Sequence, residues 1–190
     1  MQKSRSNEWL FSCKILTARA RTKQYSILMK HNTKTFDLCL FIIALAVPVT
    51  AGVIGSLATS SQIDTWYATL IKPGFNPPNW VFGPVWSLLY LLQGIAFYSI
   101  LRQRMWPRKI ATGLFLFQIT LNLLWSLIFF GLHQPVWALV DIVFLWGSII
   151  LTMWSFSPIN YKAAQLLWPY LAWVTFATAL NVGIVVLNFA

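Results

Sequence analysis

Residues 38–58 read LCLFIIALAVPVTAGVIGSLA and contain no charged side chain. At a rise of 1.5 Å per residue, about 20 residues span the roughly 30 Å hydrocarbon core of a bilayer. This stretch is therefore long enough to cross a membrane as one helix. Pro48 and Gly52 inside it do not change that conclusion, because neighbouring helices in a membrane protein satisfy the backbone groups that such residues free.

Four further stretches have a similar length and polarity. They are residues 81–101, 110–132, 136–156 and 166–190. The hydrophobic fraction of the whole chain is 58%, whereas soluble domains have about 45–50%. The sequence therefore predicts an all-α membrane protein, a five-transmembrane-helix bundle over residues 37–190, and it excludes a soluble globular domain.

The distribution of Lys and Arg predicts the orientation of the bundle. Thirteen of the 14 basic residues lie in the N-terminal arm, the second loop and the fourth loop, which share one side of a five-span protein. Only Lys72, in the first loop, lies on the other side. Because cytoplasmic loops carry the excess of basic residues, we expect a cytoplasmic N-terminus. A bacterial cytoplasmic membrane is the expected location, with a mitochondrial or other organellar membrane as the alternative.

The formal net charge of +10 does not indicate a nucleic-acid partner. Nucleic-acid binders gather basic residues on one face, whereas here they separate apolar stretches. Cys13 and Cys39 form no CxxC motif, so no disulfide framework is expected. His31 and His133 lie too far apart to predict a metal site. We also find no nucleophile beside a base and no pair of carboxylates, so no catalytic residue is predicted.

Residues 1–36 form a basic N-terminal arm in which Glu8 is the only acid. This composition is typical of a disordered arm, and it also resembles an organellar transit peptide. A start of synthesis at Met29, just before the first span, is a third interpretation. We favour an arm or a misplaced start over a targeting signal.

Three of the predicted helices each carry a stripe of aromatic and amide side chains at helical spacing. The stripes are Trp86, Tyr90 and Gln93; Gln118, Asn122, Trp125 and Phe129; and Tyr170, Trp173, Ala177 and Asn181. Polar side chains inside a membrane seldom face lipid. The stripes therefore indicate either hydrogen bonds that hold the helices together or an aromatic-walled pocket for a small molecule.

Two other features of the spans allow a structural and a functional interpretation. Asp141 is the only acid inside a predicted span, but it lies near the interface, where water or His133 would satisfy it. Ala51 and Gly55 form a small-xxx-small pattern that predicts close helix packing within the subunit, or else the contact of a homodimer.

Three segments carry a resemblance to a known family. Residues 66–90 read WYATLIKPGFNPPNWVFGPVWSLLY, residues 121–131 read LNLLWSLIFFG, and residues 169–181 read PYLAWVTFATALN. Together they resemble the translocator protein family, also called tryptophan-rich sensory proteins, TspO/MBR proteins or peripheral-type benzodiazepine receptors. The matches occur in the right order over about residues 38–190, and their combination is specific.

The resemblance implies a five-helix bundle, often dimeric, with a pocket that opens toward the first loop. Its ligands are porphyrins, haem precursors, sterols or synthetic isoquinolines. By position, the first loop would supply a lid and three helices would supply the wall. The implied ligand-binding residues are Trp66, Tyr67, Trp86, Tyr90, Asn122, Trp125, Trp173 and Ala177.

We therefore expect the chain to bind tetrapyrroles such as protoporphyrin IX, for sensing or transport, with the porphyrin as ligand and no cofactor. The alternatives are a light- and oxygen-dependent porphyrin-degrading enzyme and a scaffold in a membrane complex. Residues 182–190, VGIVVLNFA, lack the aromatic and basic residues of the cholesterol motif proposed for animal members. A tetrapyrrole role is accordingly favoured over sterol handling.

Overall fold

The computed structural model describes residues 36–103 and 108–189. The chain separates into two compact units, residues 1–39 and residues 40–190. The predicted arm lies outside the described residues except for Phe36, and so do Cys13, Met29 and His31. The site discussed below lies entirely within the second unit.

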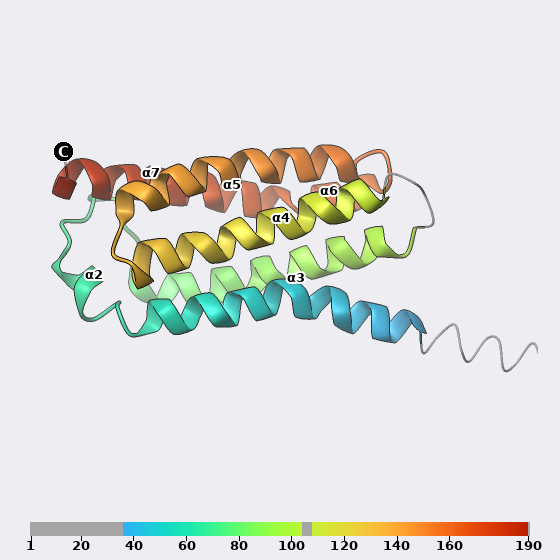
Figure 1. The fold of residues 1–190 in the computed structure, drawn as a ribbon, viewed down its shortest axis with the longest axis horizontal. Helices are drawn as coiled ribbons and strands as arrows, with labels where there is room; N and C mark the ends of the chain where they lie inside the picture. The colour runs from blue at the N-terminus through green and yellow to red at the C-terminus, as the bar shows by residue number, and fades with distance from the viewer. Residues whose placement is uncertain (1–35, 104–107, 190) are drawn as a thin grey trace, which may run out of the picture. The chain divides into compact units, whose positions relative to one another are not determined.

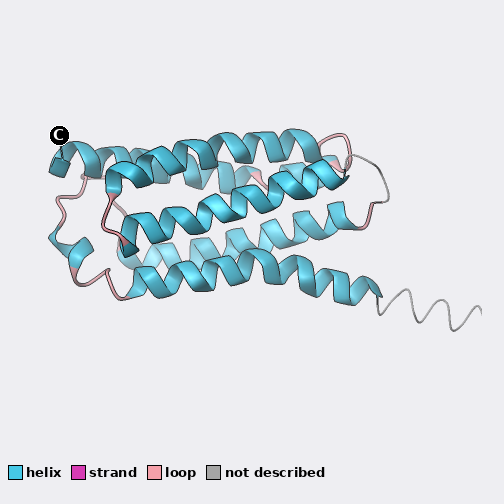
Figure 2. Cartoon of the chain, viewed as in Figure 1, coloured by secondary structure: helices cyan, strands magenta, loops and turns pink. Residues whose placement is uncertain are grey.

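Five helical segments of the described chain are long and apolar enough to cross a membrane, which confirms the predicted fold class (Figure 1). The first helix spans Phe36–Ser60. After it come α2 (Trp66–Thr69), η1 (Asn79–Val81), α3 (Phe82–Leu101), α4 (Arg108–Ser126), η2 (Leu127–Gly131), α5 (Pro135–Phe156), α6 (Tyr161–Gln165) and α7 (Trp168–Phe189). The described residues contain helices and loops without a strand (Figure 2).

Two segments differ from the sequence prediction. The last span begins earlier than residue 166, because Asn160 accepts a hydrogen bond from the backbone N–H of Ala163 and so caps α6. The first loop, which lies between the first two predicted spans, contains a helical turn, α2, at Trp66–Thr69. This turn ends before Pro73, and residues 71–78, which contain three prolines, are not helical.

Aromatic stacking holds α3, α4 and α5 together at the end of the bundle away from the first loop. The rings of Phe97 and Phe115 are stacked with centroids 4.1 Å apart. The Phe156 ring is also stacked on Phe115, with centroids 6.0 Å apart. All three side chains are buried, and they belong to the largest apolar cluster of residues 40–190.

Glycines allow the first helix to approach α3 and α4 closely. A Cβ atom added at Gly52 would overlap the ring of Tyr90, and one at Gly55 would lie 3.1 Å from the Ser126 hydroxyl. A Cβ atom at Gly94 of α3 would lie 2.5 Å from the Leu45 side chain. The small residues of the first helix are therefore used for packing within the subunit, and the homodimer remains a prediction.

Candidate ligand-binding site

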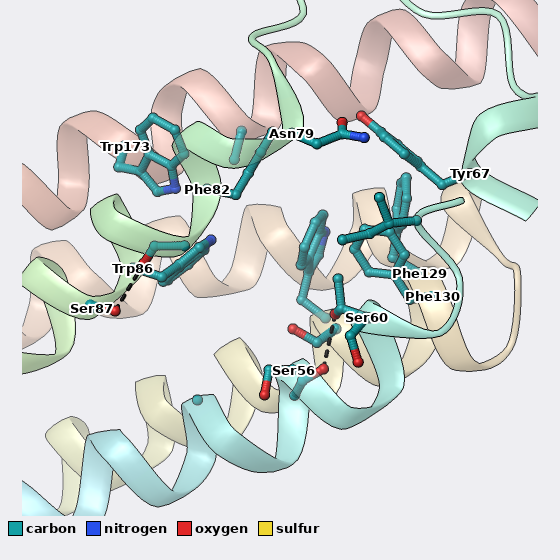
Figure 3. Close-up of a pocket in the computed structure, with 18 of the residues that line it drawn as sticks. Ser56, Ser60, Tyr67, Asn79, Phe82, Trp86, Ser87, Phe129, Phe130 and Trp173 are labelled. Carbon is teal, nitrogen blue, oxygen red and sulfur yellow. Dashed lines mark hydrogen bonds between the residues drawn. The ribbon is translucent and has the colours of Figure 1, made fainter. Parts of the chain in front are cut away.

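Residues 40–190 form a half-open cavity of about 660 Å³ beside the first loop (Figure 3). Its lining comes from the first helix, the first loop, α3, α4, η2 and α7. The aromatic lining residues are Tyr67, Trp80, Phe82, Trp86, Tyr90, Trp125, Phe129, Phe130 and Trp173. Small ligands are usually bound in cavities of about 300–1,000 Å³ with mainly apolar and aromatic walls. The size and the lining of this cavity therefore suit a flat, apolar small molecule.

Six of the eight residues assigned to the site from the sequence line this cavity. They are Tyr67, Trp86, Tyr90, Trp125, Trp173 and Ala177. Asn122 and Trp66 do not line it. Asn122 lies behind the wall, 3% exposed, and accepts a hydrogen bond of 3.1 Å from the Tyr90 hydroxyl. Trp66 lies beside the loop between η2 and α5, where its indole stacks on the ring of His133 at 4.3 Å.

The wall contributed by α3 is a stacked pair of aromatic rings. Trp86 and Tyr90 are four residues apart, so their side chains lie on one face of the helix. Their ring centroids are 5.4 Å apart with an angle of 26° between the planes. Gly52 makes room for the Tyr90 ring against the first helix, and the Tyr90 hydroxyl reaches Asn122 of α4. The first helix, α3 and α4 thus fix this wall together.

The walls contributed by α4 and α7 hold two indoles with different hydrogen bonding. The Trp125 N–H donates to the Asn181 side chain at 3.1 Å, and the Asn181 amide donates to the carbonyl of Pro135 at 2.9 Å. By contrast, the buried Trp173 N–H has no hydrogen-bond partner among the described residues. Trp173 lines the cavity, but its N–H is covered by neighbouring atoms, so the indole must shift slightly before it can donate to a ligand acceptor.

The π-helical segment η2 brings two phenylalanines into the cavity. It widens the end of α4 over Leu127–Gly131, a distortion that often occurs at functional sites. Phe129 and Phe130 of this segment both line the cavity, and the Phe129 ring stacks on Trp125 at 5.1 Å. The sequence motif contained both phenylalanines, but its helical period did not predict that Phe130 faces the same cavity as Phe129.

The first loop supplies Tyr67 to the cavity. Its hydroxyl donates a 3.0 Å hydrogen bond to the Asn76 side chain, and the Lys72 ammonium lies 4.7 Å from the centre of its ring. Burial raises the pKa of the Tyr67 phenol above its ordinary value of 10.0. The phenol is therefore neutral at physiological pH and keeps its proton for hydrogen bonding.

Asn188 of α7 attaches the first loop to the bundle. Its side-chain oxygen accepts from the backbone N–H of Ile71 at 2.9 Å, and its side-chain nitrogen donates to the Ile71 carbonyl at 2.9 Å. Gly183, earlier on the same helix, leaves room for Pro73 of the loop. A Cβ atom added at Gly183 would lie 3.0 Å from the proline ring. Asn188 was absent from the residues assigned by sequence, because no local pattern connects positions 71 and 188.

Asn188→Leu is expected to release the loop while leaving the helices folded. Both hydrogen bonds to Ile71 are lost, and each contributes about 1 kcal/mol in proteins. Hydrogen–deuterium exchange of residues 66–78 should become about 30-fold faster, which corresponds to the loss of about 2 kcal/mol. Leu187→Ala at the neighbouring exposed position is the control and should not change the exchange. Unaltered loop protection in Asn188→Leu would show that other contacts hold the loop.

Asp141 and His133 are not paired as the sequence had suggested. His133 lies 3.0 Å from the Gln62 side chain and stacks on Trp66. Asp141 is 8% exposed, and one of its carboxylate oxygens has no hydrogen-bond partner among the described residues. Asp141 does not line the cavity, so a direct ligand contact is not assigned to it.

Five apolar helices, of which all but α5 line an aromatic cavity, define a multi-pass integral membrane protein. The model of the TspO/MBR family matches residues 44–187, and the chain belongs to this family. The three segments quoted from the sequence all lie within that range, so the resemblance is confirmed.

Similar proteins come from archaea, bacteria and animals. The tryptophan-rich protein TspO of Archaeoglobus fulgidus is 46% identical over 72% of this chain and 89% of the relative. A protein of the same name from Chlorobaculum tepidum is 42% identical over 84% of this chain and 99% of its own length. The human translocator protein is 39% identical over 67% of this chain and 78% of its own.

Proposed function

We propose that the protein binds tetrapyrroles such as protoporphyrin IX in the aromatic cavity, for sensing or transport across the membrane. The observation that carries this proposal is the pairing of stacked aromatic walls with an unused buried donor. Trp86 and Tyr90 offer flat faces, while the Trp173 N–H lacks a partner among the described residues. Membership of the TspO/MBR family supports the same ligand class.

The chemistry of a porphyrin matches these groups. Its macrocycle is a large aromatic plane, which stacks favourably on indole and phenol rings. Its peripheral carboxylates accept hydrogen bonds from N–H and O–H donors. The Trp173 indole carries such a donor at the cavity wall, so a ligand that draws the N–H toward it would satisfy a group that the protein leaves unpaired.

A scaffold role does not require this arrangement, because an assembly surface needs no internal cavity. Binding and degradation differ in one observable respect. Degradation of a porphyrin in light and oxygen would be chemistry of the photosensitised ligand itself, with the protein supplying orientation. The two functions are therefore distinguished by what happens to the bound ligand under illumination.

The test is a titration of the purified full-length protein with protoporphyrin IX in detergent. Tryptophan fluorescence in the dark should be quenched saturably, at about one porphyrin per chain. Porphyrin absorbance is then followed under light in the presence of oxygen. Stable absorbance supports binding for sensing or transport, and a protein-dependent loss supports degradation. Quenching that rises linearly without saturation contradicts the proposed site.

For the membrane orientation we propose a cytoplasmic N-terminus, on the basis of the 13 basic residues assigned to that side. Reporter fusions after Met105 and after Ala190 are expected to give cytoplasmic and external signals respectively. The opposite pair of signals would reverse the assignment. A bacterial cytoplasmic membrane is the proposed location.

A further inference from the structure

Two glutamines in the middle of the bundle have no hydrogen-bond partner in the described part of the chain. Gln93 of α3 and Gln118 of α4 are each 0% exposed, and both the amide nitrogen and the carbonyl oxygen of each side chain are unpaired. Neither residue lines the ligand cavity. A buried amide without a partner is costly, so this arrangement calls for a physical explanation.

Two contacts between α3 and α4 show that the glutamines lie at the same level. Tyr90 of α3 bonds to Asn122 of α4, and further along Phe97 stacks on Phe115. Gln93 lies three residues beyond Tyr90, and Gln118 lies four residues before Asn122 on the antiparallel helix. At 1.5 Å per residue these positions are about 4.5 and 6 Å from the Tyr90–Asn122 contact, so the two glutamines differ in level by about 1.5 Å.

Both glutamines also lie on the faces that bring the two helices together. Spacings of three and four residues place side chains on one helical face. Gln93 has these spacings to Tyr90 and Phe97. Gln118 has them to Asn122 and Phe115. Since the flanking residues of α3 contact the flanking residues of α4, the two amides between them point toward the same interface.

The surroundings offer the glutamines few other donors. At the level of the two glutamines, the first helix packs against α3 through an apolar side chain. Leu45 lies directly against Gly94, the neighbour of Gln93. The buried hydroxyls of α5, Ser148 and Thr152, already donate to carbonyls of their own helix at 2.7 and 2.8 Å. Besides the two amides themselves, the buried groups of matching chemistry are the Tyr90–Asn122 hydrogen bond one turn away and the Tyr170 hydroxyl of α7, which has no partner among the described residues.

We propose that Gln93 and Gln118 form a reciprocal amide pair bridged by one enclosed water, and that this pair holds the Tyr90–Asn122 hydrogen bond behind the wall of the ligand cavity. A side-chain amide has both donors and an acceptor, so two facing glutamines satisfy each other through the water. Pairing also prevents either amide from taking Tyr90 or Asn122 as its own hydrogen-bond partner and so breaking the bond between them. The effect on ligand affinity rests on the proposed function, whereas the pairing itself does not.

A double-mutant cycle on the full-length protein in detergent tests the pair without any ligand. Gln93→Leu and Gln118→Leu each leave one amide buried without its partner, and each should lower the melting temperature by about 4–8 °C. The variant with both substitutions removes both amides and should melt within about 2 °C of the wild type. Gln165→Leu, the same substitution at an exposed position, is the control and should not change the melting temperature.

Binding of protoporphyrin IX tests the positioning role. Each single variant should raise the dissociation constant of the folded protein about 3–10-fold, because the remaining amide competes for Tyr90 or Asn122. The double variant should bind within about 2-fold of the wild type. A merely structural pair would change the melting temperature and leave the dissociation constant of all three variants unaltered.

Two outcomes of the cycle would overturn the pairing. Additive losses of stability in the double variant would show that each glutamine has its own separate partner. Higher stability in every variant would show that neither amide makes a useful hydrogen bond. If wild-type protein does not bind porphyrin, the proposed function fails, while recovery of stability in the double variant still supports the pair.

Discussion

Gly52→Ala is expected to weaken porphyrin binding about 30-fold, which corresponds to about 2 kcal/mol. The added Cβ atom would overlap the ring of Tyr90, so either the ring or the first helix must move. Movement of the ring breaks the hydrogen bond to Asn122 and disturbs the stack with Trp86. The melting temperature should fall as well, because Tyr90 and Asn122 then lose a hydrogen bond in a membrane interior. Titration with protoporphyrin IX measures the first effect and thermal unfolding in detergent the second.

The same substitution at Gly83 is the matched control. Gly83 also lines the cavity, but a Cβ atom there meets no atom within 4 Å. Gly83→Ala should therefore leave the dissociation constant within about 2-fold of the wild type, with a slight gain in stability from helix propensity. Equal binding by the Gly52 and Gly83 variants would mean that the position of Tyr90 does not control the site.

The helices and the faces that line the cavity could be predicted because they depend on local properties of the sequence. An apolar run such as residues 38–58 has few alternatives to a spanning helix. Helical spacing placed Trp86 with Tyr90, and Trp173 with Ala177, and the structure brings all four to one cavity. These predictions required only the period of the helix and the cost of exposing polar groups to lipid.

The depth of a side chain within a helical face could not be predicted in the same way. Asn122 shares a face with Trp125, but Tyr90 from the neighbouring helix covers it and takes its oxygen as a partner. Likewise, Trp66 stacks on His133, a residue in a different loop. Such contacts depend on how separate helices and loops pack against one another. The spacing of residues along a single helix carries no information about that packing.

Trp173→Phe is expected to lower mainly the affinity for porphyrin, whereas Trp125→Phe is expected to lower mainly the stability of the protein. The Trp173 N–H has no partner among the described residues, so its loss breaks no known hydrogen bond of the protein. The Trp125 N–H donates to Asn181, and its loss leaves that buried oxygen unpaired. Trp173→Phe should thus weaken porphyrin binding about 10-fold with little change in melting temperature. Trp125→Phe should lower the melting temperature by several degrees, with a smaller change in affinity.

Both indoles line the same cavity, so the two variants lose similar stacking area and differ mainly in the fate of the N–H group. Each phenylalanine still stacks on a porphyrin, because a smaller aromatic ring retains the same kind of interaction. The difference between the variants therefore measures the hydrogen bond itself. If Trp173→Phe leaves the dissociation constant unchanged, the unpaired indole does not bind the ligand. A loss of stability in that variant equal to the loss in Trp125→Phe would show instead that the Trp173 N–H serves the packing of the helices.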